Sequence, residues 1–142
     1  MATAASDRKT LDVKLFTPVG SMFEDESVLV VVPGVAGELG LMARHEPLVT
    51  SLRNGEVRIH GTDETVHTFA TTQGYASIGD DRVYILVEQA ERLDAIDVAR
   101  AEKALGEARS ALDAETDETE RAIIEATIRR NENRIKVAQK SR

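Results

Sequence analysis

The 142-residue chain contains no cysteine, no tryptophan and few other aromatic residues, three Phe and two Tyr. The lack of cysteine excludes disulfide bonds, thiolate catalysis and thiolate metal ligands. The few aromatic rings disfavour stacking platforms for bases or sugars. Apolar runs such as residues 28–32 have the length of a strand and are far too short to span a bilayer. The N-terminus lacks the apolar core of a signal peptide, which is consistent with a cytosolic protein.

Positive charge is also limited, because 18 Lys and Arg side chains face 25 Asp and Glu side chains, giving a net charge of −7. An acidic chain neutralises nucleic-acid phosphates poorly, so we expect no nucleic-acid partner. Apolar residues make up 42% of the chain, as in ordinary globular proteins.

Glycine and proline are absent from most of the second part of the chain. Eight of nine glycines and all three prolines precede residue 80, and only Gly106 lies beyond. Such a change in composition indicates a domain boundary near residues 91–94. We therefore expect a loose tail over residues 1–10, a strand-rich domain over 11–91 and a helical domain over 92–142.

The strand-rich part shows apolar–polar alternation interrupted by turn signals such as Asn54-Gly55. No helix of useful length fits between these segments, which excludes a parallel βαβ sheet. The pattern predicts an α+β protein, an antiparallel β-sandwich or flattened barrel followed by an antiparallel α-helical hairpin. About nine short strands are expected, among them 11–15, 28–32 (buried on both faces), 39–42, 48–52, 57–60, 65–72, 74–78 and 83–87.

The helical part carries two apolar seams with spacings of three and four residues. We expect Asp94 to cap the first helix and Thr116 or Asp117 to cap the second. The seams are narrow and one contains a polar Asn131, so the hairpin should be weakly held and open to rearrangement by a partner. The seam positions are Val98, Ala101, Leu105, Ala108 and Leu112, then Ile124, Ile128, Asn131, Ile135 and Ala138.

The sequence offers no convincing catalytic or metal site. Residues 34–40 are glycine-rich, but strand-like residues follow where a phosphate loop needs a helix, so turns between strands are the better interpretation. His60 and His67 are expected on facing strands, both on the solvent face beside Arg58, which makes a poor metal site. His45 lies in a loop with no nucleophile at a recognisable spacing, so turn architecture or a protein contact is favoured.

Charged pairs are the remaining candidates. Asp80-Asp81 and Asp117-Glu118 lie in predicted turns and are expected to be solvated, without acid–base work. Arg130 and Arg134 are four residues apart on one helical face and repel each other. A solvated basic face is the simpler interpretation, and an anionic partner such as phosphate or an acidic protein surface is the alternative.

Two blocks of the sequence resemble the epsilon subunit of bacterial F-type ATP synthases, called delta in mitochondria. The first is 37–41 (Gly-Glu-Leu-Gly-Leu) with 45–50 (His-Glu-Pro-Leu-Val-Thr), followed by Leu52 and Gly55. The second is 74–76 (Gly-Tyr-Ala) with the strand 83–87, where Gln73 replaces a usual glycine. The order of sandwich and hairpin agrees with this family over about residues 10–140.

The resemblance implies a non-catalytic central-stalk rotor subunit of a proton-translocating synthase. The sandwich would bind the gamma subunit and sit on the c-ring, touching the membrane only through that ring, at the cytoplasmic face of the bacterial plasma membrane. The hairpin would lie compact or extend into the catalytic alpha/beta hexamer and inhibit ATP hydrolysis. Residues implied at the gamma and c-ring interface are Glu38, Leu39, Gly40, His45 and Pro47.

The same resemblance implies a regulatory ATP site in the hairpin, although no cofactor is required. The family pattern Ile/Leu-Asp-x-x-Arg-Ala is matched at residues 96–101, and a further family arginine is replaced by Glu107, which would repel phosphate. Weak ATP binding, a bound phosphate and a protein carboxylate stay open as alternatives. The implied nucleotide-binding residues are Glu91, Ile96, Asp97, Arg100, Ala101, Arg130 and Arg134.

Two function classes other than a rotor subunit are weighed. One is a stand-alone sandwich-and-hairpin scaffold of another complex, which co-purification with a gamma-type subunit would distinguish. The other is a hydrolase, which is disfavoured because no nucleophile, base and orienting group occur together.

Overall fold

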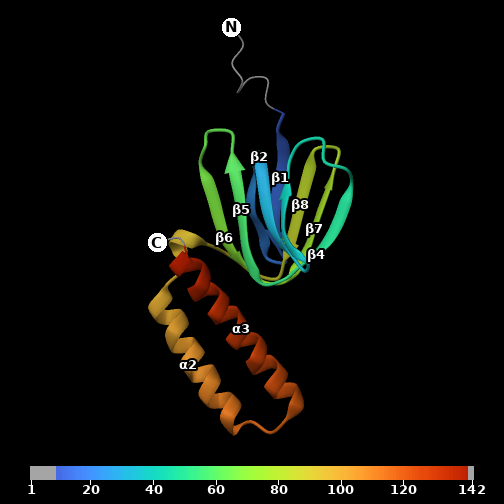
Figure 1. The fold of residues 1–142 in the computed structure, drawn as a ribbon. Helices are drawn as coiled ribbons and strands as arrows, with labels where there is room; N and C mark the ends of the chain where they lie inside the picture. The colour runs from blue at the N-terminus through green and yellow to red at the C-terminus, as the bar shows by residue number, and fades with distance from the viewer. Residues whose placement is uncertain (1–8, 141–142) are drawn as a thin grey trace. The chain divides into compact units, whose positions relative to one another are not determined.

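The computed structural model describes residues 9–140, so the expected tail over residues 1–10 lies almost entirely outside the described residues. The chain divides into two compact units, Met1–Ala90 and Glu91–Arg142. Strands form the first unit and helices the second, which confirms the predicted α+β class (Figure 1).

Nine strands form within the described residues, and most follow the expected alternation. In β1 the residues Leu11, Val13 and Leu15 are buried while their neighbours face outward. The strands are β1 (Leu11–Thr17), β2 (Gly20–Gly34), β3 (Gly37–Leu41), β4 (Leu48–Leu52), β5 (Gly55–Gly61), β6 (Val66–Thr71), β7 (Gly74–Gly79), β8 (Arg82–Val87) and β9 (Ala90–Arg92).

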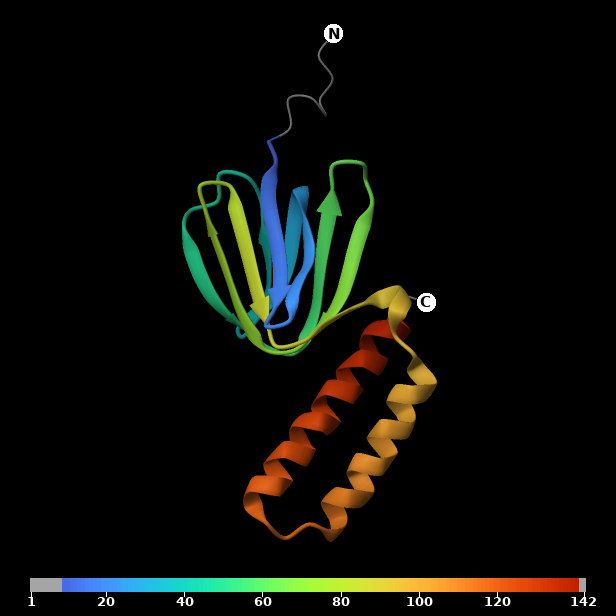
Figure 2. The same cartoon turned by 180° about the vertical axis from the view of Figure 1, so that it is seen from behind.

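The sandwich is closed by pairings between strands that are distant in the sequence. The strand order runs β1-β8-β7-β4-β2-β5-β6, and β1 also pairs with β2, so five of these strands form a ring. The pairing of β1 with β8 is parallel, which corrects the expectation of a wholly antiparallel sheet. Figures 1 and 2 show the resulting sandwich from its two sides, with β4, β7 and β8 at one end of the row and β5 and β6 at the other.

Strand β2 is much longer than the predicted strand 28–32. Its first half pairs with β1 and its second half pairs with β5 and β3, with a bulge between Ser27 and Leu29. The acidic residues 24–26 gave no apolar signal because they lie exposed on this strand. Residues 28–32 are not buried on both faces, since Val30 and Val32 are buried and Val31 is half-buried.

The glycines at residues 34–40 serve a strand connection, as the sequence suggested. Gly34 pairs with Gly37 across a two-residue turn between β2 and β3. A Cβ at position 34 would come within 2.8 Å of the Gly37 carbonyl oxygen, and Gly37 has φ +135°, a conformation that favours glycine. The turn leads into a strand and not a helix, so it lacks the amide cluster of a phosphate loop.

The core fills the interior of the sandwich. Large members such as Phe69, Ile59 and Ile85 are fully shielded from solvent. The core consists of Leu11, Val13, Leu15, Phe23, Val30, Val32, Leu41, Leu52, Val57, Ile59, Phe69, Ala76, Ile78, Val83, Ile85 and Val87.

His67 is not on the solvent face with Arg58, which corrects the expectation for this histidine. The register pairs His67 with the buried Ile59, whereas His60 pairs with the exposed Val66. The His67 ring packs against Phe23 with centroids 5.0 Å apart. A one-residue difference in register moves a side chain to the opposite face, so the two histidines are on different faces of the hairpin.

The second unit contains a short 3-10 turn, η1 (Leu93–Ala95), followed by α2 (Val98–Ala114) and α3 (Glu118–Lys140). The cap of α2 is Asp97, whose carboxylate accepts a hydrogen bond from the Arg100 amide at 3.1 Å. The prediction of Asp94 was therefore wrong, because residues 93–95 form the separate 3-10 turn. Of the two caps predicted for the second helix, Thr116 and Asp117, the structure shows Asp117, whose carboxylate accepts a hydrogen bond from the Glu120 amide at 3.0 Å.

The buried residues of α2 lie on the predicted seam, and the seam prediction for α3 is met only in part. Asn131 and Ala138 are buried as expected, but Val137 is buried without having been predicted, and Ile124, Ile128 and Ile135 are half-buried. On α2, Ala101, Leu105 and Ala108 are buried, while Val98 and Leu112 are half-buried. The Arg121 guanidinium of α3 closes the connection by donating to the carbonyls of Leu112 and Glu115 at 2.9 and 2.8 Å. The Leu112 carbonyl also accepts from the Glu115 amide at 3.3 Å, and Arg121 adds a side-chain donor to both carbonyls at the end of α2, which helps fix the turn of the hairpin.

Candidate functional site

The residues implied at a partner interface lie on β3 and on the loop that follows it. Glu38 is exposed and forms an ion pair with Arg58 at 3.1 Å, whereas Leu39 packs partly against the core. Burial alone would lower the pKa of Arg58, but hydrogen bonds to Glu38 and Glu56 outweigh it and raise that pKa above its ordinary value. The charged Arg58 guanidinium thus holds Glu38 in place on the surface through their ion pair.

The loop of residues 42–47 connects β3 to β4 and presents His45 and Pro47 to solvent. The His45 amide donates to the Met42 carbonyl at 3.2 Å. The His45 Nδ1 lies 2.7 Å from the Glu46 carbonyl oxygen, a contact that requires the proton on Nδ1. This leaves Nε2 of the neutral ring as an acceptor for a partner.

The structure adds an apolar surface that the sequence analysis missed, which we call the outer strip: Phe16, Val49, Tyr75, Tyr84 and Leu86. These side chains lie on the outward face of β1, β8, β7 and β4. The register places Tyr75 opposite Leu86 and Leu86 opposite Phe16, so the three form one row across the strands. Tyr75 is 60% exposed and Val49 is 72% exposed. The sequence feature that could have revealed this surface is the run Val-Tyr-Ile-Leu-Val at 83–87. In this run the outward-facing Tyr84 and Leu86 are apolar, as are the inward-facing residues.

A pocket of about 440 Å³ continues the outer strip at one end. Tyr75 and Leu86 of the strip line this pocket together with Val35 and Pro18, which come from two turns. Its other lining residues are Ser51, Leu52, Gln73, Gly74, Val87 and Glu88. An exposed apolar strip of this kind, with a pocket beside it, is typical of a protein-binding surface.

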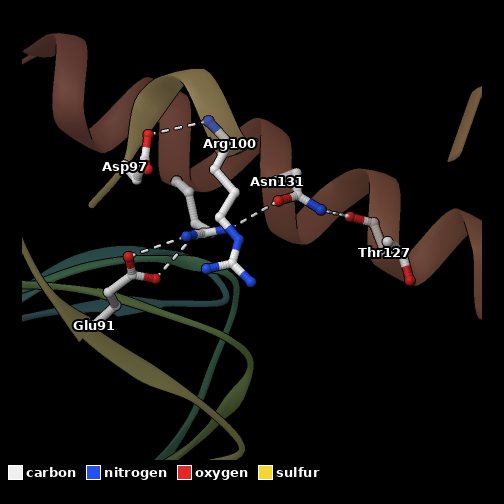
Figure 3. A network of polar contacts seen from close by, with 6 residues as sticks. Glu91, Asp97, Arg100, Thr127 and Asn131 are labelled. Atoms are coloured by element: carbon white, nitrogen blue, oxygen red, sulfur yellow. Dashed lines mark hydrogen bonds and ion pairs between the residues drawn. The ribbon is translucent and has the colours of Figure 1, made fainter. Parts of the chain in front are cut away.

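The second unit brings together Glu91 and Arg134, two of the implied nucleotide-binding residues. The Arg134 Nε and Nη2 atoms donate hydrogen bonds to the two carboxylate oxygens of Glu91 at 2.9 and 3.1 Å, which makes a bidentate ion pair (Figure 3). Both side chains are only partly exposed. The pair joins α3 to the segment before α2 and neutralises Arg134, so the predicted repulsion between Arg130 and Arg134 is reduced.

Asn131, the polar residue of the seam, is 3% exposed and is satisfied entirely within α3. Its amide donates to the Thr127 carbonyl at 2.9 Å, and its Oδ1 accepts from Arg134 at 3.0 Å (Figure 3). None of these three residues lies on α2. Separating the helices would therefore not break these hydrogen bonds of Asn131.

The other implied nucleotide-binding residues lie around the start of α2 and along α3. Asp97 is engaged as the helix cap, and Ala101 is fully buried. Ile96 is half-buried and its amide donates to the Leu93 carbonyl at 3.3 Å. Arg100 and Arg130 form no side-chain ion pair with any residue in the described part of the chain. Among residues 9–140, therefore, no carboxylate competes with an added anion for these two guanidinium groups.

Neither a metal centre nor a membrane-spanning helix is found in residues 9–140. No group of three or more His, Asp or Glu side chains in this range is placed to hold a metal ion. No helix in the same range has the length and apolar character needed to cross a membrane.

Comparison with known proteins gives concordant matches. A model of the family described as ATP synthase, Delta/Epsilon chain, beta-sandwich domain matches residues 10–93. A relative named ATP synthase epsilon chain from Latilactobacillus sakei subsp. sakei (strain 23K) is 36% identical over 140 residues, covering 94% of this chain and 95% of its own length. Another of the same name from Acidithiobacillus ferridurans is 38% identical over 133 residues and covers 94% of both chains.

Solved structures share the fold at lower sequence identity. A chain of the Euglena gracilis mitochondrial ATP synthase structure, OSCP/F1/c-ring in rotational state 1, aligns with a TM-score of 0.74 at 22% identity. That alignment covers 93% of this chain and 80% of that one. A chain from the Tetrahymena thermophila mitochondrial ATP synthase central stalk/c-ring aligns with a TM-score of 0.54 at 16% identity, covering 63% and 71%.

Proposed function

Because this chain belongs to the family of ATP synthase delta/epsilon chains, we propose that it is the non-catalytic rotor subunit of a proton-translocating F-type ATP synthase. In this role the sandwich binds the gamma subunit and the c-ring and transmits torque between them. The chain then associates with the cytoplasmic face of a bacterial plasma membrane only through the c-ring.

The observation that carries this proposal is the outer strip. Five apolar side chains on one sheet face, next to a pocket, are unusual on a surface that meets only water. We assign the strip to the gamma subunit, with Tyr75 and Leu86 at its centre and the pocket receiving an apolar side chain of gamma. Glu38, Gly40, His45 and Pro47, at the edge strand and its loop, are assigned to the remaining contacts with gamma and the c-ring.

Binding of the full chain to a purified gamma subunit tests the proposal. Leu86→Glu places a charge in the middle of the strip and should weaken binding about 30-fold or more, as expected when about 2 kcal/mol of interface energy is lost. Val66→Glu is the matched control, because Val66 is a similarly exposed apolar residue on β6. Failure of the unaltered chain to bind gamma would instead favour a scaffold of another complex, and equal losses in both variants would remove the strip as the interface.

We propose further that the hairpin regulates the synthase by leaving its compact form and entering the alpha/beta hexamer, where it inhibits ATP hydrolysis. Two features support this: two of the three buried residues of α2 are alanines, and the hydrogen bonds that Asn131 makes within α3 do not depend on α2. Truncation after Glu91 should preserve gamma binding and reduce inhibition of the reconstituted enzyme. Full-length Asn131→Leu should also reduce inhibition, because an apolar seam favours the compact form. Unchanged inhibition in both variants would contradict the regulatory role.

A weak regulatory ATP site in the same hairpin is the last part of the proposal. The guanidinium groups of Arg100 and Arg130, which form no ion pair with another described residue, support it. Glu107 and the ion pair of Arg134 with Glu91 limit its affinity. Isothermal titration with MgATP should give heat at millimolar ligand, and Arg130→Gln should abolish it. Inorganic phosphate in a parallel titration distinguishes a nucleotide site from a general anion site. No heat with MgATP would overturn this part.

A further inference from the structure

The loop of residues 42–47 contains a backbone conformation that its sequence does not favour. Arg44 has φ +69°, in the left-handed region where a residue with a Cβ is strained. The loop contains no glycine or asparagine to relieve this strain. The hydrogen bond from the His45 amide to the Met42 carbonyl supports the loop from within, and a contact from outside the loop adds a second restraint.

Asp81 supplies that restraint from the turn between β7 and β8. Its Oδ1 accepts a hydrogen bond from the Arg44 amide at 2.6 Å, across 37 positions of sequence. The Asp81 carbonyl also accepts from the Asp12 amide at 2.9 Å, at the start of the sandwich strands. One residue thus ties the loop to two other segments of the same unit.

A role in its own turn does not explain the Asp81 carboxylate. Asp80 and Asp81 have φ +51° and +59°, as in the tight two-residue turn that joins antiparallel strands. Asp-Gly is among the preferred pairs for such a turn, so glycine would serve at position 81 at least as well. The Asp81 carboxylate instead acts on the loop of residues 42–47, where it accepts the hydrogen bond of the Arg44 amide.

The restrained loop lies beside the outer strip. It leads directly into β4, which carries Val49, and Pro47 lies in van der Waals range of the position that a Cβ on Gly79 would occupy. The loop presents Met42, 59% exposed, together with the His45 ring. Side chains held in place before binding lose less conformational entropy when a partner docks.

We propose that Asp81 is a positioning residue for partner binding: its carboxylate fixes the loop of residues 42–47 so that Met42 and His45 extend the outer strip as a rigid contact for the gamma subunit. This inference rests on the proposed function for the identity of the partner. Asp81 itself makes no contact with the partner and acts through the Arg44 amide.

Asp81→Gly in the full chain separates the two roles of this residue. Glycine keeps the turn but removes the carboxylate, so the fold should be retained while the Arg44 amide exchanges with solvent faster. Affinity for purified gamma subunit should fall about tenfold, the effect of losing preorganisation of a few side chains. Asp81→Asn retains an oxygen acceptor and should restore most of both properties, and Asp80→Gly is the matched control that should change neither.

The outcomes distinguish this inference from the proposed function. If the unaltered chain does not bind gamma, the proposed function fails. If it binds, and Asp81→Gly accelerates exchange of the Arg44 amide without weakening the complex, the positioning role is overturned. Unchanged exchange at Arg44 in Asp81→Gly would overturn the restraint itself.

Discussion

The two units of this chain are stabilised by different interactions. The sandwich buries large side chains completely, Phe69, Ile59 and Ile85 among them. In the described part of the hairpin, the fully buried side chain is Ala101, and polar contacts such as Glu91 with Arg134 join its segments. Apolar burial in a closed sandwich gives one rigid arrangement, whereas a narrow seam with ion pairs gives a packing that a partner can replace.

The largest expected effect is a cavity in the sandwich. Ile85→Ala should reduce the free energy of unfolding by about 2–5 kcal/mol, whereas Ile128→Ala on the hairpin seam should cost about 1 kcal/mol because Ile128 is only half-buried. Urea unfolding measures both, with tyrosine fluorescence reporting the sandwich, which holds Tyr75 and Tyr84, and helical circular dichroism reporting the hairpin. Equal losses in the two variants would refute the contrast between the units.

The next effect is local to the hairpin. Glu91→Gln removes one charge of the bidentate pair and should weaken the attachment of α3 by about 1.5–3 kcal/mol, the usual value for a hydrogen bond to a charged group. Amide hydrogen exchange should accelerate in α3 around Arg134 and not in the sandwich. Arg109→Gln is the control, because the ion pair of Arg109 with Glu132 is well exposed and should contribute little. Acceleration of the same size in the control would remove the distinction.

Helix capping gives a smaller effect. Asp97→Ala should destabilise α2 by about 1 kcal/mol, since the Arg100 amide loses its acceptor. Asp94→Ala should change helix stability very little, because Asp94 belongs to the 3-10 turn. Thermal melting followed by circular dichroism compares the two. A larger loss at Asp94 would restore the boundary originally expected from the sequence.

The smallest effect is a titration in the β5–β6 turn of the sandwich. The pKa of Asp63 is lowered below its ordinary value of 3.8, mainly by a hydrogen bond from the Thr65 amide and to a smaller extent by one from the Thr65 side chain. Because the pKa of Asp63 is lower in the folded state, the contact contributes its full stabilisation when the pH is above the ordinary pKa of 3.8. That stabilisation is lost as the pH falls through the lowered pKa of the folded state. Carbon-detected NMR titration of the Asp63 carboxyl should show the shift, and Thr65→Ala should keep most of it. An unshifted carboxyl would show that the contact does not persist in solution.

Local patterns in the sequence predicted most elements of the sandwich but few of its long-range relations. Alternation located β1, and glycine and proline located the turns beside it. The first half of β2 was missed because residues 24–26 are acidic and exposed, and only pairing with β1 makes them a strand. The face of His67 was wrong because strand register depends on the partner strand.

The candidate sites show the same division. Local residue patterns drew attention to His45 and to the Arg130–Arg134 pair, whereas Glu91 came from the family resemblance alone. The sequence did not indicate that Arg134 pairs with Glu91, or that Asp81 holds the Arg44 amide, because these contacts join positions far apart in sequence. The outer strip was missed because outward apolar positions on separate strands become one surface only when register aligns them.

The sequence by itself determined the α+β class, the separation of strands from helices and the helical seams, because hydrophobic period and turn residues act over a few neighbouring positions. Only the tertiary structure decided the parallel pairing of β1 with β8, the outer strip and the restraint of Arg44 by Asp81. Each of these features depends on which segments, far apart in the sequence, come into contact in the fold. The local conformational preferences of a segment do not specify its distant partners.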